Sequence, residues 1–267
     1  MKQMKKMIAL LMAVLMLAAC GAMFASCSST RVVTVGYTIY APMNYRDGDG
    51  NLIGFDTELA EAVFEELGYK VIFKEIKWDN KYTDLESGTI SCIWNGFTAN
   101  TADDDGVARA EKVDFSYNYM RNKQVVVIKK GTEVATAVDL AGKTGVAESG
   151  SAGESYAISL NENANIKGVT KQTDALMEVK SGSAAFAVLD EQLAKSYCGK
   201  GDYADLQIVG AMSSSEEFYA IGFKKGSDLT AKVNEALIEL NDKGELEKLA
   251  RKYGLENSVI TNFNNQK

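Results

Sequence analysis

None of the 267 residues is histidine, so the groups that could do chemistry in this chain are charged, amide, hydroxyl and thiol groups. The absence of histidine excludes Ser-His and Cys-His nucleophile pairs, a histidine general base and zinc sites that use histidine. The sequence also has no metal-binding cluster, phosphate loop or nucleophile motif. We therefore expect no catalytic residue and no cofactor, which leaves groups that bind a charged ligand as the candidates.

One candidate anion site is the segment Ser151-Ala152-Gly153-Glu154. Its pattern is that of a capping box, with serine at the N-cap of a helix and glutamate three residues later. The free backbone amides at such a helix start, together with the helix dipole, can bind an anion. Ala152 can contribute only its N–H. Capping and anion binding are compatible at this position.

The charge balance argues against nucleic acid as a partner. The chain has 29 Lys and Arg against 36 Asp and Glu, a net charge of −7. The first 19 residues hold three lysines and no acid, so the remainder carries 26 basic against 36 acidic residues, a net charge of −10. Such a surface repels phosphate backbones. With 46% hydrophobic and 24% charged residues, the composition is that of an ordinary globular protein.

Hydrophobic periodicity after residue 31 alternates between strand and helix, which predicts an α/β fold with parallel strands covered by helices. A first β-α-β-α-β unit comprises strands 32–35, 71–73 and 90–94 and helices 56–67 and 79–87. A second comprises strands 144–147, 169–171 and 184–189 and helices 151–160 and 173–181. Two similar lobes are therefore expected. Ligands of open α/β sheets bind beyond the carboxyl ends of strands, so the cleft between the lobes is the expected site.

Two extended segments, Gln124–Ile128 and Phe218–Phe223, are expected to cross between the lobes as a two-segment hinge that permits closure by rotation. The final helices, 229–242 and 246–253, carry apolar residues at helical spacing and are expected to pack on the first lobe. We assign residues 31–124 and 220–267 to the first lobe and residues 125–219 to the second.

The N-terminus has the features of a targeting signal. Lys2, Lys5 and Lys6 precede an apolar run from Met7 to Ala19, and the following Cys20 completes a segment that resembles the lipobox of bacterial lipoproteins. We expect a signal peptide over residues 1–19, lipidation at Cys20 and a tether over residues 20–30. The folded part would then lie at the extracellular face of the cytoplasmic membrane, anchored by lipid. Lipidation at Cys27 and an uncleaved membrane anchor are the alternatives.

Motifs along the chain after the signal resemble the polar amino-acid family of extracellular solute-binding proteins, family 3, the capture subunits of ABC importers. Each motif is weak alone, and their order and spacing together are specific. The motifs are Val35-Gly36, Tyr40-Ala41-Pro42, Gly54–Ala60, Trp78-Asp79, Leu85–Gly88, Val113–Tyr117, Leu140–Lys143, Gly150–Gly153, Val188–Glu191, Asn234–Leu237 and Lys252–Gly254.

The resemblance implies a type II periplasmic-binding-protein fold and a monomeric receptor. The receptor would bind a free amino acid between its lobes and deliver it to an ABC permease in the membrane. The alternative is an enzyme on the same scaffold, similar to cyclohexadienyl dehydratases, with Glu148 as acid and base. A buried amino acid needs donors for its carboxylate and an acid for its ammonium, because burying either charge unpaired costs several kcal/mol.

By the same resemblance, Arg109 clamps the carboxylate of the ligand, which a guanidinium can hold through two parallel hydrogen bonds. Ten residues separate Thr98 from Arg109, more than the family usually has there. This insertion could displace Arg109 and leave it on the surface, paired with the run Asp103-Asp104-Asp105. Gly96 and Thr98 correspond to positions whose carbonyl and hydroxyl contact the ammonium and the carboxylate.

The resemblance also assigns the ammonium to Asp190, which could instead cap the helix that follows it. Glu148 matches a position that faces the side chain of the ligand, where a carboxylate favours a cationic or amide group. The alternative is that Glu148 points to solvent or pairs with a lysine. Tyr40 would stack over the ligand, and Trp94 would wall the cleft or belong to the core. The expected ligand-binding residues are Tyr40, Trp94, Gly96, Thr98, Arg109, Glu148, Ser151, Ala152 and Asp190.

Overall fold

The structure, a computed structural model, describes residues 31–266. The expected signal peptide, Cys20, Cys27 and the tether lie outside the described residues. Within residues 31–266, no helix combines the length and the apolar character that crossing a bilayer requires.

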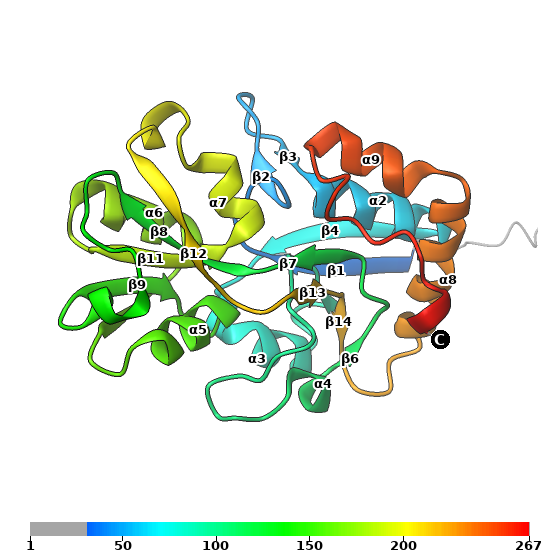
Figure 1. Cartoon of the computed structure of the whole chain (residues 1–267). Coiled ribbons are helices and arrows are strands. Elements are labelled where there is room, and N and C mark those ends of the chain that lie inside the picture. The colour runs from blue at the N-terminus through cyan, green and yellow to red at the C-terminus, as the bar shows by residue number, and fades with distance from the viewer. Residues whose placement is uncertain (1–30, 267) are drawn as a thin grey trace, which may run out of the picture. The chain divides into compact units, whose positions relative to one another are not determined.

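Two five-stranded sheets organise the described part of the chain (Figure 1). The strand orders are β4-β1-β5-β14-β6 and β10-β9-β11-β8-β12. Each central strand, β5 in the first sheet and β11 in the second, pairs in parallel with one neighbour and antiparallel with the other. This shared topology confirms the prediction of two similar α/β lobes. The strands of the first sheet are β1 (Arg31–Tyr37), β4 (Tyr69–Glu75), β5 (Cys92–Ile93), β6 (Asp114–Phe115) and β14 (Gly222–Phe223). Those of the second are β8 (Gln124–Lys129), β9 (Thr144–Glu148), β10 (Asn165–Val169), β11 (Phe186–Asp190) and β12 (Leu206–Ser213).

The helices follow the predicted periodicity. Helices α8 and α9 pack on α2 in the first lobe, as expected, and bury the apolar faces that carry Leu59, Leu237 and Leu246. The second lobe has α5, α6 and α7 around its sheet (Figure 1). The helices are α2 (Phe55–Glu66), α3 (Lys81–Glu86), α4 (Arg109–Lys112), α5 (Ala152–Leu160), α6 (Gln172–Ser181), α7 (Glu191–Tyr197), α8 (Leu229–Asp242) and α9 (Glu245–Tyr253).

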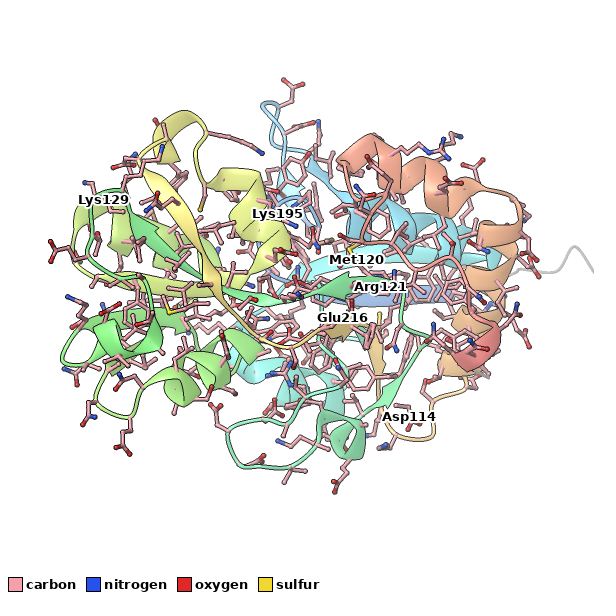
Figure 2. All side chains as sticks on the ribbon, in the orientation of Figure 1. Asp114, Met120, Arg121, Lys129, Lys195 and Glu216 are labelled. Atoms are coloured by element: carbon pink, nitrogen blue, oxygen red, sulfur yellow. The ribbon has the colours of Figure 1, made fainter. Side chains whose placement is uncertain are left out.

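The connection between the lobes begins earlier in the chain than predicted. Residues 124–129 do not cross between the lobes but form β8 inside the second sheet, because the run Val125–Ile128 is apolar throughout and buried on both faces. The crossing segments are β7 (Met120–Asn122) and β13 (Glu217–Tyr219), which pair antiparallel. Figure 2 labels Met120, Arg121 and Glu216 in this region.

Strand β10 was also misplaced by the sequence pattern. The predicted strand covered residues 169–171, whereas β10 ends at Val169. It is an edge strand in which only Ile166 and Val169 are partly buried, with Lys167 and Gly168 exposed between them. The alternation that marks a half-buried strand is therefore missing. A short hairpin, β2 (Tyr45–Arg46) with β3 (Leu52–Ile53), was not predicted.

Gly54 is required by the turn that leads into α2, and we predict a large stability loss for Gly54→Ala. Its φ of 129° and ψ of 167° belong to a region that is essentially open to glycine alone. An added Cβ would lie 2.1 Å from the carbonyl oxygen of Met43. We expect the free energy of unfolding in urea to fall by more than about 3 kcal/mol.

The matched control is Gly88→Ala. Gly88 has a φ of 74°, and within the described residues its Cβ would have no atom within 4 Å. Only the cost of the left-handed backbone remains, about 1–2 kcal/mol. Equal losses for the two variants would contradict the steric explanation for Gly54.

Candidate ligand-binding site

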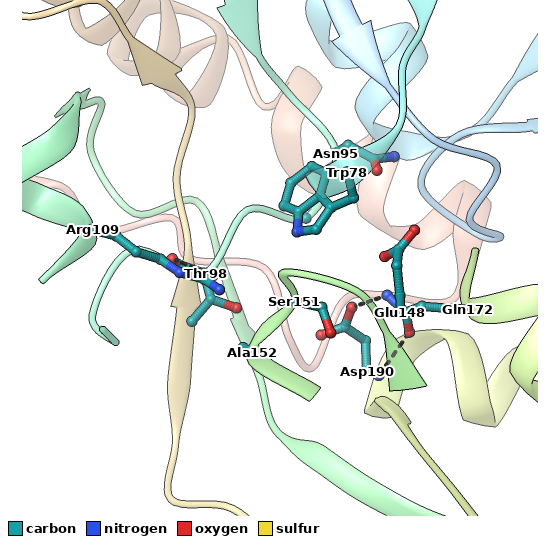
Figure 3. Close-up of a pocket in the computed structure, with 10 residues that line it drawn as sticks. Trp78, Asn95, Thr98, Arg109, Glu148, Ser151, Ala152, Gln172 and Asp190 are labelled. Atoms are coloured by element: carbon teal, nitrogen blue, oxygen red, sulfur yellow. Dashed lines mark hydrogen bonds between the residues drawn. The ribbon is translucent and has the colours of Figure 1, made fainter. Parts of the chain in front are cut away.

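A narrow cavity of about 10 Å³ lies between the two lobes, which leaves room for about one water molecule in this arrangement of the lobes. The first lobe contributes Arg109 and Thr98, and the second contributes Glu148, Gln172 and Asp190 (Figure 3). In this view the two groups lie on opposite sides, with Trp78 above and between them. The complete lining is Trp78, Asn95, Gly96, Thr98, Arg109, Glu148, Ser151, Ala152, Gln172 and Asp190.

Arg109 reaches the cavity despite the insertion that precedes it. Its side chain is only 1% exposed. The guanidinium donates from Nε to Asp103 Oδ1 at 2.8 Å and from Nη1 to the carbonyl of Thr98 at 3.2 Å. Its Nη2 is buried without a hydrogen-bond partner among residues 31–266. The insertion thus supplies a partner to Arg109 instead of displacing it, and one donor remains for a ligand.

The start of α5 lies on the same cavity. Ser151 is its N-cap and accepts a hydrogen bond from the N–H of Glu154 at 3.0 Å, as the capping-box pattern predicts. The carboxylate of Glu154 accepts from the N–H of Gly150 at 2.8 Å. Ala152 is the first residue of the helix and lines the cavity. Because the first N–H groups of a helix have no partner within it, Ala152 can offer its amide to an anion.

Asp190 is held by three amide side chains rather than by a cation. Its Oδ1 accepts from Asn122 Nδ2 at 2.6 Å and from Gln124 Nε2 at 2.7 Å, and its Oδ2 accepts from Gln172 Nε2 at 2.5 Å. Burial raises the pKa of Asp190, and these amide donors oppose that shift. Asp190 occupies the N-cap position of α7 without a capping hydrogen bond from its side chain. The carboxylate is therefore directed to the cavity instead of to the helix that follows.

Glu148 is the last residue of β9 and is buried beside Asp190, with 3% of its surface exposed. Its Oε1 has no hydrogen-bond partner among the described residues. Burial, and secondarily the charge of Asp190, raise the pKa of Glu148 well above its ordinary value. The alternative that Glu148 points to solvent is therefore wrong.

Glu217 is a third buried acid in this region, which the sequence did not reveal. It accepts hydrogen bonds from Gln124 Nε2 at 2.8 Å and from the hydroxyl of Thr98 at 3.2 Å. Burial raises the pKa of Glu217, and the charge of Asp190 raises it further. Arg109 already has Asp103 as a partner, and the charge of buried Lys81 opposes the pKa rise of Glu148. Glu148, Asp190 and Glu217 still leave more acidic than basic side chains around the cavity.

Two of the expected wall residues lie behind the cavity. Tyr40 is buried behind Gly96, where its hydroxyl lies 2.6 Å from the hydroxyl of Tyr219. An added Cβ on Gly96 would be 2.7 Å from the ring of Tyr40. Trp94 faces the core against Phe64, because successive side chains at a strand end point to opposite sides. The next residue, Asn95, takes the place in the cavity that was expected for Trp94.

Gly96 has a left-handed backbone, with φ of 57°, that turns the chain along the cavity wall. Its N–H donates to Asp56 Oδ2 at 2.8 Å, and the hydroxyl of Tyr119 donates to the same oxygen at 2.9 Å. Burial raises the pKa of Asp56 to about 7, against the effect of these two donors. Asp56 thus fixes the Gly96 turn from behind, although it does not line the cavity.

Trp78, Asn95 and Gln172 line the cavity and were not predicted as site residues. Trp78 belongs to a motif that supported the family resemblance, and Asn95 precedes the predicted Gly96. Gln172 begins α6 shortly after the carboxyl end of β10. The rule that ligands bind at strand ends could have found Gln172, but the strand was placed too late in the chain.

Comparison with known proteins agrees with this geometry. Residues 33–256 match the bacterial extracellular solute-binding proteins, family 3. The chain therefore belongs to this family, and its fold is the type II periplasmic-binding-protein fold.

Individual relatives differ in the ligand that they bind by name. The chain is 33% identical to the arginine-binding extracellular protein ArtP of Bacillus subtilis (strain 168), over 80% of this chain and 82% of that protein. It is 30% identical to the L-cystine-binding protein TcyA of the same organism, over 87% and 85%. It is also similar to an ABC uptake transporter substrate-binding protein of Streptococcus pneumoniae with bound histidine. There the TM-score is 0.73 and the identity 34%, with 83% and 92% of the chains covered.

Proposed function

We propose that this chain binds one free amino acid, with a preference for a cationic side chain, and delivers it to an ABC importer. One observation carries this proposal. Arg109 Nη2 and Glu148 Oε1 are both buried, both lack a partner among the described residues, and both belong to residues that line one cavity. Leaving a charged group buried and unpaired is costly, so each of these atoms calls for a ligand group of opposite charge.

The two ends of an amino acid suit the two sides of the cavity. The carboxylate would lie against Arg109 Nη2 and the amide of Ala152, with the hydroxyl of Thr98 nearby. The ammonium would bind Asp190, whose amide partners keep it oriented without neutralising it. The carbonyl of Gly96, another residue of the cavity lining, would be the second acceptor.

Glu148 would select the side chain of the ligand. The similar proteins described above are named for binding arginine or cystine or were solved with bound histidine, which supports amino acids as the ligand class. The three buried acids Glu148, Asp190 and Glu217 support a cationic side chain such as that of arginine or lysine, whose charge would favour their ionised forms. A glutamate ligand would place a fourth carboxylate against these acids, which costs several kcal/mol.

The two crossing segments support capture by closure. The crossing strands β7 and β13 pair antiparallel, and we propose that the lobes rotate about this pair, with residues 31–119 and 220–266 moving against residues 123–216. Lys81 Nζ donates across the cleft to the carbonyl of Gly150 at 2.9 Å. A closed monomer that presents both lobes would be the form recognised by the permease.

We predict that purified protein starting near Ser28 gains thermal stability with arginine or lysine. The expected gain is about 2.7 kcal/mol at a hundredfold excess over the dissociation constant.

Glu148→Gln should weaken arginine binding by about tenfold or more and reduce the preference for arginine over glutamine, measured by calorimetry. Because burial raises the pKa of Glu148, a cationic ligand must displace its proton at low pH. Affinity should therefore rise with pH in the wild type and do so less in Glu148→Gln.

Two outcomes would contradict this assignment. One is an unchanged ranking of arginine, lysine, histidine, glutamine, cystine and glutamate in Glu148→Gln, and the other is glutamate as the best ligand. The dehydratase alternative predicts loss of a prephenate-like acid, which absorbance detects. The binding proposal predicts no turnover of that acid.

We also predict that Arg109→Ala and Asp190→Ala each weaken amino-acid binding by about 2–5 kcal/mol, because each leaves one charge of the buried ligand unpaired. Calorimetry measures both losses. The matched controls are Arg251→Ala and Asp205→Ala, which remove exposed side chains of the same types far from the cavity lining. Near-native affinity in Arg109→Ala would mean that the carboxylate binds elsewhere.

Finally, we propose that the protein is anchored by lipid at Cys20. The support is the sequence pattern alone: three lysines, an apolar run and small residues before the cysteine. Cys20→Ala should prevent labelling by a radioactive lipid precursor, whereas Cys27→Ser should be labelled like the wild type. Labelling that survives Cys20→Ala and is lost in Cys27→Ser would move the anchor to Cys27.

A further inference from the structure

The loop of residues 99–108 has a defined fold of its own between Thr98 and Arg109. Asp103 N–H donates to the carbonyl of Val107 at 3.0 Å, and Gly106 N–H donates to the carbonyl of Asp103 at 2.8 Å. Arg109 N–H donates to the carbonyl of Thr101 at 3.1 Å and closes the base of the loop. The three acids of the loop are therefore presented at fixed places.

Asp103 faces inward and holds the guanidinium of Arg109. It accepts from Arg109 Nε at 2.8 Å through Oδ1 and from Lys112 Nζ at 2.8 Å through Oδ2. Arg109 Nη1 is held separately by the carbonyl of Thr98. A planar group fixed at Nε and Nη1 has its third nitrogen fixed as well. The direction of Nη2 into the cavity therefore depends on Asp103.

Asp104, the next residue, contacts the opposite lobe. Its Oδ1 accepts a hydrogen bond from the hydroxyl of Ser155 at 2.5 Å. Ser155 lies in α5, three residues after Ala152, whose amide borders the cavity. An acid is also favourable near the N-terminal turn of a helix, where the dipole is positive. The same loop thus touches both elements that would bind a ligand carboxylate.

We propose that the loop of residues 99–108 positions the two halves of the carboxylate site. Asp103 is the positioning residue that orients the guanidinium of Arg109. Asp104 holds α5 at the distance at which Arg109 and the amide of Ala152 can contact one carboxylate. The proposal rests on the proposed binding of an amino acid and adds a role for residues that do not touch the ligand. It also explains how the chain tolerates an insertion next to Arg109.

Asp103→Ala tests whether Asp103 orients the guanidinium of Arg109, and Asp105→Ala is the matched control. Asp105 lies in the same loop and also binds Lys112, at 2.7 Å, but its side chain is 56% exposed against 12% for Asp103. L-Arginine and L-arginine methyl ester are titrated into each variant. We expect Asp103→Ala to weaken arginine binding by about tenfold or more and the ester by much less. Asp105→Ala should change both within about twofold.

The ratio of the affinities for L-arginine and for its methyl ester distinguishes a loss of positioning from a general loss of folding. A variant that is merely less well folded loses affinity for acid and ester alike, and its ratio stays that of the wild type. In an Arg109→Ala background, Asp103→Ala should cause no further loss, because the group that it positions is gone. An unchanged ratio or a further loss in that background would overturn the role of Asp103. A wild type that binds no amino acid would instead contradict the proposed function itself.

Asp104→Ala and Ser155→Ala test the contact between the lobes. Each should raise the dissociation rate of L-arginine by about fivefold in stopped-flow measurements, with the association rate within about twofold of the wild type. The double variant should be no faster than either single variant, because both remove one hydrogen bond. Unchanged dissociation rates, or effects that multiply in the double variant, would overturn the role of Asp104.

Discussion

The cost of holding charged groups away from water determines the arrangement around the cavity. Arg109 is almost fully buried and is tolerated because Asp103 and the carbonyl of Thr98 take two of its nitrogens. Asp190 is tolerated because three amide side chains donate to it. These partners leave Nη2 of Arg109 without a hydrogen bond among the described residues, and they do not supply a cation to Asp190. What is left, one guanidinium nitrogen and a buried acidic surface, is complementary to an amino acid.

The fold supports this arrangement by bringing together chain segments that are distant in sequence. Glu148 and Asp190 end β9 and β11, which are neighbours in the second sheet. Gly96 lies in the turn that follows β5, and Arg109 begins α4 directly after the inserted loop of the first lobe. Buried Asp56 fixes the Gly96 turn, and Glu217 of the hinge strand β13 accepts from Thr98. The crossing strand β13 and the cavity lining therefore share a hydrogen bond.

Local patterns predicted the fold well where the chain gives a periodic signal. The N-cap at Ser151 and the apolar faces of α8 and α9 were predicted correctly because both depend on neighbouring residues, although Glu154 accepts from the N–H of Gly150 and not from that of Ser151 as a capping box requires. Strand β10 was misplaced, since an edge strand with Lys167 and Gly168 lacks alternation. Trp94 and Asn95 could not be told apart as core and cavity residues, because one residue of register reverses the side that each faces. The ion pair of Asp103 with Arg109 could not be predicted from the sequence. The length of the insertion and its three aspartates were equally compatible with an arginine displaced to the surface.

The most direct measurement is a crystal structure of the protein grown with L-arginine. We expect one carboxylate oxygen about 3 Å from Arg109 Nη2, the α-ammonium at the same distance from Asp190, and the guanidinium of the ligand against Glu148. A ligand bound in the reverse orientation, with its carboxylate beside Asp190, would contradict the proposed binding mode. So would a cavity that stays without amino acid at saturating concentrations while the lobes remain folded.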